Sequence, residues 1–83
     1  VPPMCTIQIV GGRKEKIRPG DVLGACTGEA GFAASQIGKI KVTEFHTYVG
    51  VVAEIADEAV RRLGAGQLKG RKVKLRKLDD VVR

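Results

Sequence analysis

The chain has 83 residues, a formal net charge of +6 at pH 7 and a sequence pI near 9.8. This length suits one small domain, and a hydrophobic content of 43% supports a folded core and argues against disorder. No apolar run approaches the roughly 20 residues of a membrane-spanning helix, and no signal-peptide pattern is present. The basic balance favours an anionic partner: RNA, DNA or an anionic membrane surface.

The chain opens with a predicted strand and a glycine-rich basic turn. Apolar and polar residues alternate from Met4 to Val10, which predicts the strand. Gly11 and Gly12 begin the turn, and Pro19 fixes φ where a helix would start. Because helix N-termini present unpaired N–H groups, a strand that enters a helix through such a turn predicts an anion cradle. The basic residues of this turn are Arg13, Lys14, Lys16 and Arg18.

The middle of the chain predicts one helix and two strands. The helix runs from Pro19 to about Gly28, and a connector of small residues follows from Ala30 to Ser35. A second strand is expected over Ile37–Glu44, with Lys39 and Lys41 on its outward face. Phe45 and His46 form the turn or begin the third strand, Thr47–Val52, whose alternation puts Tyr48 on the outward face, with His46 if the strand starts early.

The last part predicts a second helix and a fourth strand. Glu54–Leu63 has an apolar row and carries acids before bases, and its spacing predicts the ion pairs Asp57–Arg61 and Glu58–Arg62. Arg71–Leu78 is expected to be a strand with Val73 and Leu75 inward. Its outward residues are Lys72, Lys74 and Arg76.

This element order is β-α-β-β-α-β, which predicts an α+β, ferredoxin-like sandwich of the RNA-recognition-motif type. Right-handed crossovers put both helices on one face of a four-stranded antiparallel sheet, with strands one and three in the centre. The domain would span residues 4–78, after a linker end at 1–3 and before a tail at 79–83. The open sheet face would carry Thr6, Gln8, Lys39, Lys41, Tyr48, Lys72, Lys74 and Arg76.

An enzyme is a poor fit to these residues. The chain has no Asn, one His and a single Ser, Ser35, so neither a Ser–His–acid set nor an Asn to position water is available. Cys5 and Cys26 lack metal-ligand spacing, and they suit buried, reduced thiols of a cytosolic protein. A protein-interaction or small-ligand module remains an alternative, and it requires an apolar open face.

Clustering of the basic residues favours nucleic acid. Six bases with no intervening acid lie near the end of the chain: Lys69, Arg71, Lys72, Lys74, Arg76 and Lys77. An RNA-recognition motif also needs stacking rings on the central strands. Against its third-strand consensus, the segment from Glu44 to Val51 matches clearly only at Tyr48 and Val49. Electrostatics would then supply much of the affinity.

Several short motifs, taken together and in order, carry a family resemblance. They are Gly11-Gly12 with the basic run after it, Arg18–Ala25, Thr27–Gly31, Ile37–Ile40, Thr47–Val49 and Lys69–Arg71. The set resembles the C-terminal RNA-binding domain of the DbpA family of bacterial DEAD-box RNA helicases, from about Met4 to Leu78. Sparse rings on the sheet are consistent with that family.

The resemblance implies a divergent RNA-recognition motif that tethers an ATP-dependent helicase core to a hairpin of 23S ribosomal RNA, near the peptidyl-transferase region. Its partners would be the pre-50S particle and the helicase core of the same parent chain, in the cytoplasm, with the domain itself monomeric. The chain contains neither a Gly-Lys-Ser/Thr phosphate loop nor Asp-Glu-Ala-Asp. We therefore expect no ATPase activity and no cofactor here, with ATP and magnesium belonging to the core.

The candidate contacts fall into two groups. The basic turn ranks first, with Arg13, Lys14, Lys16 and Arg18 on phosphates and Arg13 or Arg18 at a base edge. The open face ranks second, with Tyr48 stacking on a base among Lys39, Lys41, Lys72, Lys74 and Arg76. His46, Lys69 and Arg71 complete the set. The sequence leaves open which group dominates, and an RNA hairpin could span both.

Overall fold

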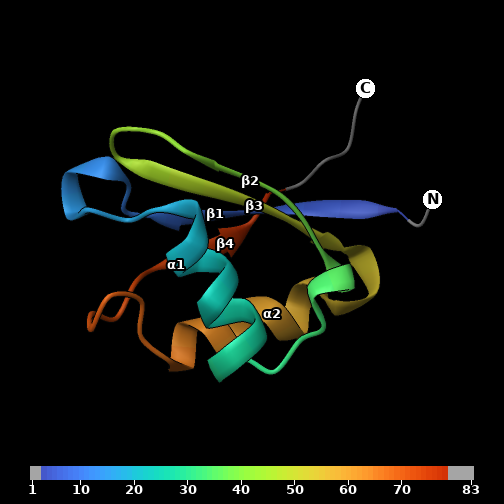
Figure 1. Ribbon diagram of the computed structural model, residues 1–83. Helices are drawn as coiled ribbons and strands as arrows, with labels where there is room; N and C mark the ends of the chain where they lie inside the picture. Colours follow the sequence, from blue (N-terminus) through green and yellow to red (C-terminus); the bar gives the residue numbers. More distant parts are fainter. Residues whose placement is uncertain (1–2, 79–83) are drawn as a thin grey trace.

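A computed structural model describes residues 3–78, so the expected tail at 79–83 and most of the expected linker lie outside the described residues. The chain forms a four-stranded antiparallel sheet with its two helices on one face, which confirms the predicted fold class (Figure 1). The strand order is β2-β3-β1-β4, so the first and third strands are central, as predicted. The strands are β1 (Met4–Val10), β2 (Ile37–Val42), β3 (His46–Val52) and β4 (Leu75–Lys77).

The longest strand pairing in the sheet joins β1 and β3. It runs without interruption from Met4↔Val52 to Val10↔His46. Because side chains alternate between faces, this register buries Ile7 and Ile9 against the helices and leaves Gln8 on the open face. The predicted first strand is therefore confirmed at both ends.

The second and third strands differ from their predicted bounds at the turn between them. The strand predicted to reach Glu44 ends at Val42, and the third strand begins one residue early, at His46. Thr43 explains the difference, because its hydroxyl and its backbone N–H both donate to the His46 carbonyl, at 2.8 Å each. These bonds close a tight turn over residues 43–46.

Both predicted helices are present, with altered ends. Helix α1 (Pro19–Gly24) continues as a π-helical segment, Ala25–Glu29, so the predicted extent is nearly right but its second half is wider than an α-helix. Helix α2 (Ala56–Ala65) follows a 3₁₀ turn at Ala53–Ile55 and ends two residues later than predicted. A further 3₁₀ turn, Ala34–Gln36, lies in the connector.

The fourth strand is much shorter than predicted. Only Leu75–Lys77 pairs with β1, and residues 71–74 lie outside any strand. In an antiparallel register that pairs Ile9 with Leu75, Lys74 lies opposite Val10, the last residue of β1, and the residues before Lys74 need a partner beyond it. The chain turns away at Gly11, so that partner edge does not exist. Lys72 therefore lies outside any strand, and Lys74 lies just before β4, where its carbonyl accepts from the Val10 N–H, which corrects the sequence interpretation.

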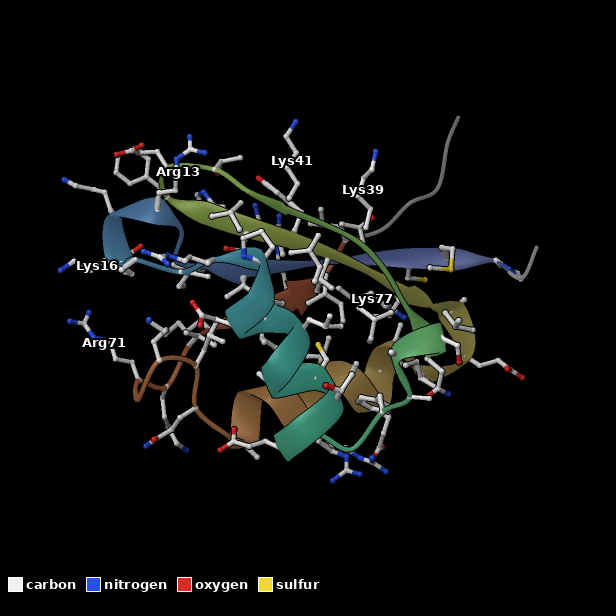
Figure 2. The ribbon with its side chains drawn as sticks, viewed as in Figure 1. Arg13, Lys16, Lys39, Lys41, Arg71 and Lys77 are labelled. Carbon is white, nitrogen blue, oxygen red and sulfur yellow. The ribbon has the colours of Figure 1, made fainter. Side chains whose placement is uncertain are left out.

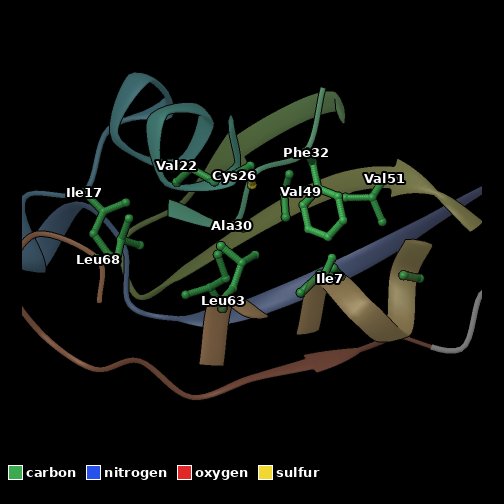
Figure 3. Packing of buried hydrophobic residues seen from close by; sticks show 13 residues of the cluster. Ile7, Ile17, Val22, Cys26, Ala30, Phe32, Val49, Val51, Leu63 and Leu68 are labelled. Carbon is green, nitrogen blue, oxygen red and sulfur yellow. The ribbon is translucent and has the colours of Figure 1, made fainter. Parts of the chain in front are cut away.

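The core lies between the sheet and the two helices (Figure 3). Val49 and Val51 of β3 join the buried residues of β1, and Val22, Ala59 and Leu63 reach them from the helices. Cys26 is also buried, and that burial raises the pKa of its thiol to about 11. It therefore acts as a small hydrophobic residue, and both cysteines are free.

Charges on α2 are paired partly as predicted. Glu58 accepts from Arg62 Nε at 2.7 Å, which confirms one pair, and it also pairs with Arg61. Hydrogen bonds from Arg61 and Arg62 lower the pKa of Glu58 to about 2. The predicted Asp57–Arg61 pair is wrong, because Asp57 lies 2.9 Å from Lys77 Nζ of β4.

Candidate nucleic-acid interface

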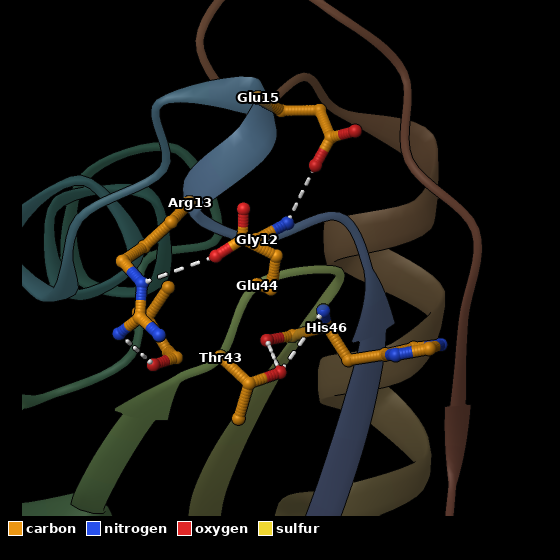
Figure 4. Close-up of polar contacts among 7 residues, drawn as sticks. Gly12, Arg13, Glu15, Thr43, Glu44 and His46 are labelled. Atoms are coloured by element: carbon orange, nitrogen blue, oxygen red, sulfur yellow. Dashed lines mark hydrogen bonds and ion pairs between the residues drawn. The ribbon is translucent and has the colours of Figure 1, made fainter.

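The basic turn is docked onto the turn between β2 and β3 (Figure 4). The N–H of Arg13 donates to the Thr43 carbonyl at 2.8 Å, and the N–H of Lys14 donates to the Glu44 carbonyl at 3.1 Å. Gly12 makes this approach possible, because a Cβ there would lie 2.1 Å from the Thr43 carbonyl oxygen. The buried hydroxyl of Thr47 donates to the Gly11 carbonyl at 2.7 Å and anchors the turn to β3. The loop is therefore part of the folded body.

Backbone N–H groups of this turn are already occupied, which corrects the predicted anion cradle. The Glu15 carboxylate accepts from the Gly12 N–H at 2.7 Å, and the Asp21 carboxylate accepts from the Arg18 N–H at 3.0 Å. The chain thus supplies its own anions where a phosphate was expected. Any phosphate contact at this loop must come from the basic side chains.

Two basic segments that are far apart in the sequence meet at one end of the molecule. Loop 11–18 and loop 68–73 line a common cavity of about 140 Å³, with Ile17 and Leu68 in its apolar wall and Lys69, Arg71 and Lys72 on its side. Lys16 and Arg71 project from this same end in Figure 2. We call this surface the basic end. It comprises Arg13, Lys14, Lys16, Arg18, Lys69, Arg71 and Lys72.

Backbone conformation marks two of these lysines. Lys16 has φ 64° and Lys69 has φ 55°, and within residues 3–78 these are the positive-φ residues other than glycine. A left-handed conformation costs a non-glycine residue roughly 1–2 kcal/mol. One such lysine lies in each of the two loops that form the basic end. The chain therefore keeps a cationic side chain at two positions where glycine would be less strained.

The cations of the basic end differ in their intramolecular partners. Arg13 is engaged, since Nη1 donates to the Val42 carbonyl at 3.1 Å and Nε lies 3.8 Å from Glu44. Lys69 lies 3.7 Å from Asp21. Within the described part of the chain, the remaining cations of the basic end make no ion pair: Lys14, Lys16, Arg18, Arg71 and Lys72.

The open sheet face carries a row of polar side chains that crosses all four strands. The register aligns Lys41 with Tyr48, Tyr48 with Gln8, and Gln8 with Arg76. Gln8 Nε2 donates to the Tyr48 hydroxyl and Arg76 Nε donates to Gln8 Oε1, both at 3.2 Å. We call these four residues the sheet row. Lys39 and Lys41 flank a shallow pocket over Tyr48, and both project from β2 in Figure 2.

His46 and Lys74 lie between the sheet row and the basic end. His46 pairs with Val10 in the register, and the Val10 N–H donates to the Lys74 carbonyl at 2.8 Å. The His46 and Tyr48 rings have centroids 6.4 Å apart and planes tilted by 32°. The two candidate groups are therefore neighbouring parts of one surface.

Two members of this surface were not among the predicted contacts. Gln8 was placed correctly on the open face but given no role, and its link to Tyr48 and Arg76 is not visible in the sequence. Phe45 was assigned to the turn or to the start of the third strand and given no role in binding, yet the residue is 57% exposed beside Lys14. The signal that could have identified Phe45 in the sequence is an apolar ring at the tip of a turn.

Other kinds of site find little support in the described residues. No group of three or more His, Cys, Asp and Glu side chains in residues 3–78 could hold a metal ion. Among the described helices, none is both long and apolar enough to cross a bilayer. The open face is mainly polar and basic, with Met4 and Val10 as its exposed apolar residues, so it differs from the apolar face that an interaction module requires.

A β-α-β-β-α-β sandwich with a basic, open sheet face defines a nucleic-acid-binding domain of the RNA-recognition type. The family model described as "DbpA RNA binding domain" matches residues 6–77, and the chain belongs to this family. It is 47% identical over 75 residues to the ATP-dependent RNA helicase DbpA of Escherichia coli (strain K12). That match covers 90% of this chain and 16% of the relative, so the chain spans about one sixth of that relative's length.

Proposed function

We propose that this domain binds a hairpin of 23S ribosomal RNA and holds a DEAD-box, ATP-dependent RNA helicase at that site while the large ribosomal subunit is assembled. The observation that carries the proposal is the meeting of two basic loops at one end of an RNA-binding domain. The relative's name, an ATP-dependent RNA helicase, supports the helicase part. The partners would be the pre-50S particle and the helicase core of the parent chain.

The basic end would supply most of the phosphate contacts. Lys14, Lys16 and Arg18 project from one loop and Arg71 and Lys72 from the other, so an RNA backbone that crosses this end meets cations from both. Lys69 would add to them, in exchange with its Asp21 contact. Arg13 would mainly hold the loop to the β2–β3 turn, which leaves Arg18 as the arginine for a base edge.

The sheet face would act on the bases. Tyr48 offers a ring for stacking, and the carboxamide of Gln8 and the guanidinium of Arg76 offer donors and acceptors beside it. Lys39, Lys41, His46 and Lys74 would border the path of the RNA from this face to the basic end and attract its phosphates at longer range. A hairpin that touches both regions would be selected by shape as well as by charge.

Catalysis would lie in the helicase core, with ATP and magnesium bound there. The free thiols of Cys5 and Cys26 suit a reducing compartment, and we place the protein in the cytoplasm. We expect the domain to act as a monomer, because its charged surface disfavours self-association.

The decisive experiment compares a 23S hairpin from the peptidyl-transferase region with a scrambled hairpin of equal length, across a salt series. If four of the cations of the basic end contact phosphates, raising the salt from about 50 to 200 mM should reduce the affinity by about 50- to 150-fold. A preference for the native hairpin that persists at the higher salt supports the proposal. Equal, steeply salt-dependent binding to both RNAs would reduce the domain to a general basic tether, and no binding to either would overturn the proposal.

A further inference from the structure

Phe45 exposes an aromatic ring at the tip of the β2–β3 turn. The residue is 57% exposed, whereas the other phenylalanine of the chain, Phe32, is buried. Turn formation does not require this ring, because the turn is closed by bonds from Thr43 to His46. A polar residue would serve the turn as well and would be better solvated.

The backbone around Phe45 is held firmly by the basic turn. The Gly11 N–H donates to the Phe45 carbonyl at 2.9 Å, and the neighbouring Glu44 carbonyl accepts from Lys14 at 3.1 Å. A ring presented from a fixed backbone loses little conformational freedom when it binds a partner. An exposed ring at this position therefore loses less conformational entropy on binding than a ring on a mobile loop would lose.

The surroundings of the ring suit a nucleotide. Lys14 Nζ lies 5.8 Å from the Phe45 ring centroid, close enough for one nucleotide to meet the ring with its base and the ammonium with its phosphate. The next residue, His46, has its ring 6.4 Å from that of Tyr48 on the open face. Single exposed apolar residues are common on protein surfaces, but this ring stands beside a lysine and one residue before His46, whose ring neighbours Tyr48.

We propose that Phe45 is a stacking site for an unpaired base of the bound RNA, with Lys14 on the phosphate of the same nucleotide. The site rests on the RNA binding of the proposed function but not on the identity of the hairpin. Relative to the RNA-recognition consensus, Phe45 occupies the position of a glycine, so the ring lies outside the consensus stacking positions. It extends the binding surface from the sheet face onto the turn.

The test measures the affinity of the 83-residue chain for the 23S hairpin and for a mixed-sequence single-stranded RNA. Phe45→Ala should weaken binding by about 5- to 150-fold, the range that alanine substitution gives for base–aromatic stacking. Phe45→Tyr should retain most of the affinity and Phe45→Leu should lose most of it, since leucine keeps apolar area without a ring. Leu23→Ala is the control, because Leu23 is 39% exposed on α1 and should leave affinity unchanged.

The salt dependence separates stacking from charge. Phe45→Ala should leave the slope of log affinity against log salt unchanged, whereas Lys14→Ala should flatten it by about 0.7–0.9. If Phe45→Ala or Phe45→Leu binds both RNAs within twofold of the wild type, the stacking site is wrong. If the Phe45 effect persists but the native hairpin is not preferred, the stacking site stands and only the proposed target fails. A wild-type chain that binds no RNA overturns both.

Discussion

At the basic end, cations project from two loops that meet only in the folded chain, whereas on the sheet face they project from strands that follow one pleat. Lys16 and Lys69 occupy left-handed backbone positions, and Gly12 allows one loop to lie on the β2–β3 turn. The sheet row uses ordinary extended backbone and cross-strand bonds. The difference shows that the position of the cations depends on special backbone conformations at the basic end and on the alternation of side chains along the strands at the sheet face.

Removing the close approach at Gly12 should have the largest effect. In Gly12→Ala, the new Cβ meets the Thr43 carbonyl oxygen at 2.1 Å, so the basic turn must leave the β2–β3 turn. We expect the free energy of unfolding to fall by roughly 3 kcal/mol, as in severe overpacking, with a loss of RNA affinity. Urea denaturation measures the first quantity. Gly24→Ala is the control, since nothing lies within 4 Å of that position in α1 and the change should be neutral or stabilising.

Paired charge removal compares the two regions directly. The double variant Lys16→Ala/Lys72→Ala should flatten the salt slope of RNA binding by about 1.4–1.8, at about 0.7–0.9 for each lost phosphate contact. The matched variant Lys39→Ala/Lys41→Ala removes two exposed lysines from β2 and changes the net charge equally. It should flatten the slope by less than half as much. An equal effect of the two variants would mean that location does not matter.

Relief of strain at Lys16 should separate stability from binding. Lys16→Gly removes a side chain from a backbone with φ 64°, and the fold should gain about 1 kcal/mol of unfolding free energy. RNA affinity should fall at the same time, because a cation of the basic end is lost. Thermal unfolding and a binding titration on the same preparation give both values. A variant that is less stable, or that binds as well as the wild type, would contradict the functional reason for this lysine.

The smallest effect is expected far from both regions, at Glu58 on α2. Arg61 and Arg62 hold its folded pKa near 2, below the usual value of 4.5. A lowered folded pKa stabilises the fold above the unfolded pKa, and the contribution disappears as the pH falls from about 4.5 to about 2. Glu58→Gln should therefore lower the Tm slightly at pH 7 and have no effect near pH 2. Glu54→Gln is the charge-matched control for the effect on the Tm.

Local pattern was sufficient for most of the fold. The alternation of Ile7 and Ile9 with Gln8 predicted both the first strand and its buried face, because side chains in a strand point to opposite sides. The same period placed Thr47, Val49 and Val51 in the core and Tyr48 on the open face. Predictions that depended on contacts with another part of the chain failed more often. The fourth strand is shorter than predicted because β1 turns away at Gly11. Asp57 pairs with Lys77 of β4 and not with Arg61, its neighbour on the helix.

By itself, the sequence determined the element order, the two buried faces and the sign of the surface charge, since each follows from residue type and spacing along the chain. The family follows from its resemblance to known motifs, which the family model matches over residues 6–77. Only the tertiary structure decided that the two basic segments share one end and that Phe45 is exposed beside Lys14. The physical reason is distance. These features join residues up to tens of positions apart, and a contact of that kind depends on how the loops pack against the sheet, which periodicity does not encode.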